Sequence, residues 1–493
     1  MRTRDTQSKF PVLSRLAILI AASALLYAAE LPLPRPALFS DYPFDKWAAA
    51  PDHSSIKWEV HVLPVQLSVH QRLIQRIETV VPGGELAKRR GRGELVVLVR
   101  FEDSEGHQWR AGSHMSLMAV EPAVKSQELT FTAAAFVRPG DYRVSIALAD
   151  SETGEYNFVR RQLHVAPLKS DPLPDSWAGL PAVEVLHVSE GPDSWFLPSV
   201  HGLLKLPLRH SPDAAYSEPV PRIVNANGSP ARTTNAAYVL PSSDPPSREQ
   251  RTDAPNIEIV VNTSPSERYS ATSSSMRRNM AAVIPAFKVL SGIDAGAHSP
   301  KATVMDLTRH RITFETPSAA SLDWNALGKA LSETNPGIID AKILARQSSM
   351  REYFADEIAR RAGQSGPPRW LIVLSGSFSF GAQDDAPLPQ LAPDPNRHIV
   401  YFRFVPEFGP TGLALTAGVG TRIAPPHRVH GPTPGLGTII PFGPSHHFRG
   451  ADAFFPDDFE RILKSMGAQV VTVTNPEIFR KSLASLLDQI SAD

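Results

Sequence analysis

The spacing of apolar residues changes near residue 256, and this change divides the 493-residue chain into two regions of different class. Between about 55 and 168, apolar residues recur at nearly every second position in short runs separated by turn sequences, a pattern typical of β-strands. From 256 onward, continuously apolar runs alternate with helical patterns. We therefore expect an all-β region followed by an α/β region whose strands are buried on both faces.

The first region predicts an immunoglobulin-like or fibronectin-like β-sandwich over 55–168, since it contains short strands and no long helix. Such a module would act as a spacer or a binding unit. The turn signals include PGG at 82–84 and RPGD at 138–141, and the last two runs are typical of a hairpin. The strand-like runs are IKWEVHVLPVQ, ELVVLVRFED, ELTFTAAAFV, YRVSIALAD and YNFVRRQLHV.

Two segments rich in proline flank this region, and the chain holds 46 prolines in all. Residues 30–54 predict an extended tether, because repeated proline blocks helix and favours polyproline conformations. Residues 169–255 predict an irregular connector with a few strands, such as VEVLHV and GLLKLPLRH.

The N-terminus is typical of an export signal. Basic residues precede an uncharged apolar run of 14 residues from Leu16 to Ala29. A membrane span needs roughly 20 such residues, so residues 1–29 favour a signal peptide over an N-terminal anchor. We expect a protein of the periplasm, the cell envelope or the exterior, in contact with the membrane only through an uncleaved N-terminus.

The amino-acid composition excludes several kinds of functional site and argues against one class of partner. The chain has no cysteine, which excludes disulfides, thiolate metal sites and cysteine nucleophiles. Its 50 basic and 50 acidic residues give zero net charge, which argues against nucleic acid as a partner.

The second region, 256–490, predicts a central, mostly parallel sheet of five or six strands flanked by helices. NIEIVVN, WLIVLS and IVYFRF should be interior strands and QVVTVT an edge strand. A helix is expected over MRRNMAAVIPAFKVL, with a kink or restart near Pro285 because proline removes a backbone donor. Further helices are expected over LDWNALGKALSE, 340–362, DDFERILKSMG and PEIFRKSLASLLDQI.

A motif follows the first strand of this region, where Asn262, Ser264 and Ser266 stand in N-T-S-P-S. It resembles the D-x-S-x-S motif of von Willebrand factor A domains, with Asn in place of Asp. LIVLSGSFSFG, ALSETNPGIIDAKIL and the ending FERILKSMGAQVVTVTNPEIFRKSLASLLDQI are similar to later parts of that family. The resemblance covers 256–490 and implies a Rossmann-like α/β domain in a bacterial exported subgroup of the family.

The family's motif holds Mg²⁺ or Mn²⁺ at the carboxyl edge of the sheet. Here the resemblance places Asn262, Pro336 and Gly376 where the family has Asp, Thr and Asp. Hard cations bind carboxylate oxygens, so we expect no metal and no cofactor. Asn262, Ser264, Ser266 and Ser375 then form a degenerate binding site. In the structural alternative, Ser264 and Ser266 cap the next helix and Asn262 closes a turn.

These features favour a non-catalytic envelope module that binds a protein partner through the upper loops of the A-like domain. One alternative is a hydrolase that uses the His-rich loop 427–458, which contains His427 and His430, adjacent His446 and His447, and the acids Asp457 and Asp458. Ser375 after a buried strand is a weak nucleophile candidate. Another alternative is a glycan-binding module whose scattered tryptophans form platforms.

Overall fold

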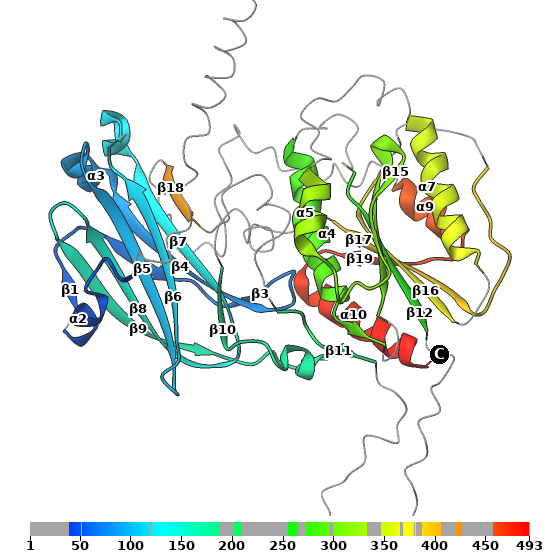
Figure 1. Ribbon diagram of the computed structural model, residues 1–493, viewed down its shortest axis with the longest axis horizontal. Helices are drawn as coiled ribbons and strands as arrows, with labels where there is room; N and C mark the ends of the chain where they lie inside the picture. Colours follow the sequence, from blue (N-terminus) through cyan, green and yellow to red (C-terminus); the bar gives the residue numbers. More distant parts are fainter. Residues whose placement is uncertain are drawn as a thin grey trace, which may run out of the picture.

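The computed structural model describes a β-sandwich and an α/β domain, which lie side by side in Figure 1. The predicted signal peptide or anchor at 1–29 lies outside the described residues. Among the helices of the described part, none is long and apolar enough to span a membrane. The described residues are 39–50, 52–118, 120–186, 202–208, 255–264, 273–295, 299–332, 347–364, 368–378, 380, 387–405, 420–424 and 457–492.

The sandwich consists of two antiparallel sheets whose inward side chains form its core. The expected hairpin of β8 and β9 is confirmed. The first sheet has the order β1 (His53–Ser54), β9 (Tyr156–Val165), β8 (Gly140–Asp150), β5 (Glu94–Asp103) and β6 (Gln108–Ser116). The second has the order β10 (Val183–Leu186), β7 (Glu128–Val137), β4 (Leu73–Pro82) and β2 (Glu59–Val62), and β3 (Gln66–Leu67) also pairs with β4.

The expected extended tether is wrong for the part of 30–54 that the structure describes. Helix α2 (Phe44–Ala49) packs on the sandwich, and strand β1 pairs with β9. The side chains of Phe44 and Trp47 are buried against Val96 and Phe158, because burying two aromatic rings outweighs the extended preference of nearby prolines. The PGG expected as a turn begins helix α3 (Gly83–Arg89).

The connector 169–255 contributes two strands in its described part. β10 completes the second sheet of the sandwich, while β11 (Leu206–Pro207) pairs in parallel with β13 (Ile293–Asp294) of the α/β domain. The short 3-10 helices η2 (Pro122–Ser126), η3 (Pro174–Trp177) and η6 (Leu307–Arg309) lie in connections. The connector therefore links the two domains through regular hydrogen bonding.

The α/β domain contains a six-stranded sheet in which only the edge strand β15 runs antiparallel to its neighbour. β12, β16 and β17 lie inside the sheet and β19 at its edge, as their apolar patterns predicted. The order is β15 (Arg311–Thr316), β14 (Lys301–Asp306), β12 (Asn256–Asn262), β16 (Arg369–Gly376), β17 (Arg397–Phe404) and β19 (Gln469–Val473).

Helices cover both faces of this sheet. Ile259 and Val261 of β12 pack in the core shared with α4 (Ser273–Leu290), α5 (Trp324–Ser332) and α10 (Pro476–Ala492). Val260 points the other way, into the core formed with α7 (Gln347–Ala362) and α9 (Asp458–Ser465). The chain is thus an α/β domain combined with an all-β domain.

The first helix does not restart at Pro285, whereas the alternative of a kink there stays a prediction. Helix α4 continues through Pro285 from Ser273 to Leu290. Proline costs one backbone hydrogen bond, but Val283, Ile284 and Phe287 around it are fully buried. Burial of this apolar face is worth enough to carry the helix through the defect.

A buried polar joint, formed by Gln71, Asp171, Trp177 and Arg480, fastens the two domains together. Arg480 of α10 makes two hydrogen bonds with Asp171, Nε to Oδ1 at 2.6 Å and Nη2 to Oδ2 at 2.8 Å. Its guanidinium lies 4.9 Å from the ring centre of Trp177, whose indole nitrogen donates to the Gln71 carbonyl. The Gln71 side chain donates to the Pro476 carbonyl at 3.0 Å. Sandwich, connector and last helix therefore meet in one network.

Candidate functional site

The central strands β12 and β16 lie side by side, and the chain leaves their carboxyl ends toward opposite sides of the sheet. In chain order the six strands of the sheet are arranged 3-2-1-4-5-6. In open α/β sheets, ligands bind outside the carboxyl ends of the strands at this reversal point. Asn262 is the last residue of β12, and Ser375 is the second-last residue of β16.

Three of the predicted site residues meet there. The Asn262 amide donates from Nδ2 to Ser375 Oγ at 2.9 Å and accepts at Oδ1 from the Ser264 backbone amide at 3.0 Å. Ser264 Oγ accepts from the Leu307 backbone amide at 2.8 Å. Between them, Thr263 donates its hydroxyl to the Met305 carbonyl at 3.0 Å. This carboxyl-edge network ties β12, β14 and β16 together. Ser266 and Pro336 lie outside the described residues.

The carboxyl-edge network is buried. Asn262 and Ser375 are 0% exposed and Ser264 is 2% exposed. Buried polar groups need partners, and here they find them in one another and in the backbone. The group in contact with the Ser375 hydroxyl is an amide, which cannot take up a proton as the base beside a nucleophile must. This arrangement holds loops in place, as the structural alternative for Asn262 anticipated.

The acids Asp457 and Asp458 fasten the loop after β16 to the start of helix α9. Asp457 Oδ1 accepts from the backbone amides of Phe459 at 3.1 Å and Glu460 at 3.3 Å, which caps the helix. The same oxygen accepts from the Phe378 amide at 3.2 Å, while Asp458 accepts from the Phe380 amide at 2.8 Å. The N-cap signal is present in the sequence before FERILK, but its second role in holding a distant loop is not.

Burial raises the pKa of Asp457 to about 6, against the opposing influence of its backbone hydrogen bonds and of Arg403. The Tyr401 hydroxyl donates to Asp457 Oδ2 at 3.2 Å and to the Gly376 carbonyl at 3.0 Å. Burial also raises the pKa of Tyr401. Gly376, which the resemblance aligned with a metal-binding Asp, thus offers only a backbone carbonyl, and this carbonyl accepts from the Tyr401 hydroxyl.

The histidines of the alternative site, His427, His430, His446 and His447, lie outside the described residues. Within the described ranges, no group of three or more His, Asp or Glu side chains is placed to hold a metal ion. The tryptophans of the glycan alternative are core residues where they are described. Trp177 and Trp370 are buried, and Trp58 and Trp109 pack partly buried against the main core.

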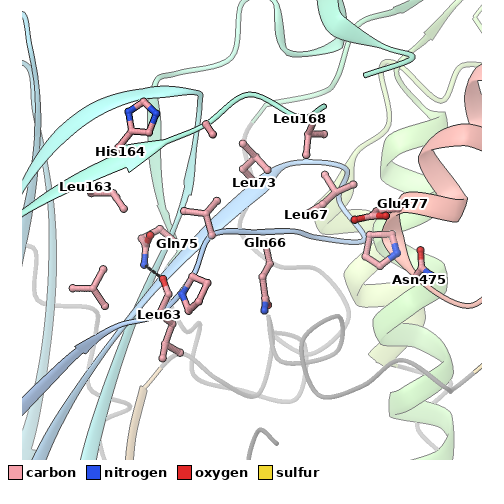
Figure 2. A pocket seen from close by; sticks show the side chains of 15 residues that line it. Leu63, Gln66, Leu67, Leu73, Gln75, Leu163, His164, Leu168, Asn475 and Glu477 are labelled. Atoms are coloured by element: carbon pink, nitrogen blue, oxygen red, sulfur yellow. Dashed lines mark hydrogen bonds between the residues drawn. The ribbon is translucent and has the colours of Figure 1, made fainter. Parts of the chain in front are cut away.

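A cleft of about 820 Å³ lies between the sandwich and the start of α10 (Figure 2). Leu63, Leu67 and Leu163 line it from the sandwich, and Asn475 and Glu477 from the α/β domain. Several of its polar groups are already engaged. Gln75 donates to the Leu63 carbonyl at 2.7 Å and Asn475 accepts from the Ile478 amide at 2.9 Å. The cleft is a seam between the domains with a mixed lining of apolar and polar side chains.

Comparison with known proteins gives no family. No family model matches the chain, and no curated protein matches it. Among solved structures, the chain is similar to one described as "Crystal structure of the C-terminal domain of wzt", at 13% sequence identity. That match covers 26% of this chain and 89% of the other, with a TM-score of 0.15, which is too low to bear on fold or function.

The carboxyl-edge network makes a prediction about metal ions. The melting temperature of the full chain should be the same in excess EDTA and in ~10 mM Mg²⁺ or Mn²⁺, because neutral oxygens repay little of the cost of dehydrating a hard cation. A ligand at 100 times its dissociation constant would add about 2.7 kcal/mol of stability. A rise of several degrees that Asn262→Ala abolishes would contradict this. The double change Asn262→Asp and Gly376→Asp is the route by which metal binding should appear.

Proposed function

We propose that the chain is a non-catalytic, protein-binding module of the cell envelope. Its C-terminal region is a von Willebrand factor A-like domain with a degenerate metal site, and its N-terminal sandwich is an immunoglobulin-like module. Two features support the assignment of the A-like domain. The sheet has the doubly wound strand order, and the motif residues Asn262, Ser264 and Ser375 converge at its carboxyl edge.

The observation that carries the proposal is the chemistry of the carboxyl-edge network. Its side chains are neutral and buried, and they bind one another. The acids Asp457 and Asp458, which a metal-dependent hydrolase would need, bind backbone amides instead. The described part of the edge thus offers buried polar groups that are already hydrogen-bonded, and this favours binding over catalysis.

The exposed surface beside this network is the turn between β14 and β15. Leu307, held by Ser264, begins the turn, and Arg309 and Arg311 are exposed on it. His310 adopts a left-handed conformation with φ of 50° and stacks on Tyr353 of α7 at 5.5 Å between ring centres. Arg309 is paired with Asp306 at 3.2 Å, and the turn also exposes Arg311, so its positive charge suits an acidic patch on a protein partner.

Site-specific photo-cross-linking tests this surface. A photoreactive amino acid replaces Arg309 in the full chain, which is then illuminated in an envelope extract. Position Lys301 is the matched control, because it is exposed at the opposite end of the same strand, β14. We expect a discrete protein adduct at 309 in several-fold excess over 301.

Equal labelling at both positions would contradict the proposed binding edge. Hydrolytic turnover that Ser375→Ala abolishes, with the variant still folded, would replace the proposal with the hydrolase alternative. A sugar adduct without a protein adduct would favour the glycan alternative.

A further inference from the structure

Strand β18 (Gly420–Ala424) belongs by sequence to the α/β region, yet it pairs with the sandwich. It follows β17 and precedes α9 along the chain, and in Figure 1 it lies beside β7, away from the strands of its own domain. Its five residues run antiparallel to Glu128–Thr132, with Arg422 opposite Thr130. The α/β region therefore lends a strand to the second sheet of the sandwich.

Among the described strands, β18 covers the part of one side of β7 that β10 leaves unpaired. β4 pairs with all ten residues of β7 on one side. The other side is shared, because β10 pairs with residues 134–137 and β18 with residues 128–132. Without β18, five residues of β7 would lose their neighbour on that side. An unpaired edge of this kind is a template for any extended chain that can reach it.

The length of chain on either side of β18 lets it reach more than one such edge. Fourteen residues, 406–419, lie between β18 and Val405, which follows β17, and 32 residues, 425–456, lie between β18 and Asp457, the N-cap of α9. Fourteen residues can span at most about 45–50 Å. Strand exchange between identical chains costs little in contacts, because each copy makes the same pairs in trans that it loses in cis.

We propose that residues 128–132 of β7 are a strand-acceptor site and that residues 420–424 exchange between two copies of this chain to form a strand-swapped dimer. The same register, Gly420 to Thr132 through Ala424 to Glu128, is satisfied within one copy or between two. Cis pairing dominates in dilute solution, because the tether gives the segment a high effective concentration. The swapped form gains as the protein concentration rises.

The absence of cysteine makes the exchange measurable, since any disulfide must come from introduced residues. The double variant Thr130→Cys/Arg422→Cys should form an intrachain disulfide in dilute solution. Single variants Thr130→Cys and Arg422→Cys, mixed at high concentration and oxidised, should form a covalent heterodimer. The matched control is Glu59→Cys mixed with Arg422→Cys, because Glu59 is exposed on β2 at the opposite edge of the same sheet.

We expect about tenfold more heterodimer with Thr130→Cys than with Glu59→Cys, and a yield that rises with concentration. Equal yields, or no heterodimer with Thr130→Cys, would overturn the exchange. The in-register pair Thr132→Cys and Gly420→Cys repeats the test in case one substitution unfolds the sandwich. A double variant that melts normally but forms no intrachain disulfide would overturn the acceptor site itself.

A peptide of residues 418–426 separates strand pairing from simple proximity. Added to the mixture, it should lower the heterodimer yield by competing for β7. In an antiparallel pair, backbone amides point alternately toward and away from the partner strand. Peptides N-methylated at 421 and 423, or at 420, 422 and 424, should therefore differ, with only one of the two still competing. Equal competition by both would contradict strand pairing.

Discussion

Replacing Arg480 with alanine should lower the free energy of unfolding by about 3–5 kcal/mol, one of the largest effects expected from a single substitution in this chain. The Arg480 side chain is 2% exposed and Asp171 is 12% exposed. Arg480 also donates to the Leu173 carbonyl at 2.8 Å and to Ser176 Oγ at 3.0 Å. The alanine variant leaves Asp171 as a mostly buried carboxylate without its cation, and charge burial without a partner is costly.

The measurement is urea unfolding followed by tryptophan fluorescence and circular dichroism. We expect the two domains to unfold in separate transitions in Arg480→Ala, since the joint that couples them is lost. Arg360→Ala is the matched control, because the Arg360 side chain is 57% exposed and Glu357 keeps Arg361 as a second cation, so the loss should be less than about 1 kcal/mol. Similar losses in both variants would show that the joint does not couple the domains.

Acid should destabilise the protein through His70. This side chain is 3% exposed, packs against Phe136 and faces the cations Arg72 and Lys288, with Glu184 as the nearby acid. Burial, helped by Lys288 and Arg72, lowers the pKa of His70 to about 3 from 6.5. Between these pH values the unfolded chain binds a proton that the folded chain does not, so stability falls as the pH drops from 6.5 toward 3. The loss is on the order of 4 kcal/mol over the whole window.

The variant His70→Leu should remove this pH dependence at little cost near neutral pH, because His70 Nε2 has no hydrogen-bond partner among the described residues. The difference in unfolding free energy between pH 7 and pH 4 should shrink by about 3 kcal/mol relative to the wild type. His164→Leu is the control at a histidine that is 72% exposed, and it should behave as the wild type does. An unchanged difference in His70→Leu would contradict the buried, neutral state of His70.

Asp457 contributes a pH dependence of stability that is opposite in sign to that of His70. It is present both in the wild type and in His70→Leu. Its folded pKa of about 6 lies above the ordinary value of 3.8, so the folded chain takes up its proton first. Stability linked to this group rises as the pH falls from 6 toward 4. The subtraction of wild type from variant removes this contribution and isolates His70.

The sequence predicted the interior of the α/β sheet well, because continuous apolar runs such as NIEIVVN are stable only in strands that are buried on both faces. It missed β6, which alternates poorly because it is an exposed edge strand, and β4, whose run is interrupted by Gln75 and Arg76. It also missed β18, because GTRIA carries no strand signal of its own. Pairing with β7 determines that strand, and such contacts are not local in sequence.

The candidate site shows the same division between local and non-local information. Family resemblance placed Asn262, Ser264 and Ser375 together, and the structure brings them within hydrogen-bond distance through the network they share. The link from Ser264 to Leu307 and the two contacts of Tyr401 depend on how neighbouring strands align. The spacing of residues within one segment does not reveal how neighbouring strands align.

The most direct test of the central claim is the photo-cross-linking comparison of positions 309 and 301 in a Ser375→Ala background. The claim is that the buried network only supports an exposed binding edge. Loss of the Asn262–Ser375 contact should cost about 1–3 kcal/mol of stability but leave the partner adduct at 309 in the same excess over 301. A folded Ser375→Ala protein that loses the adduct at 309 would contradict the claim, because Ser375 would then act on the ligand itself.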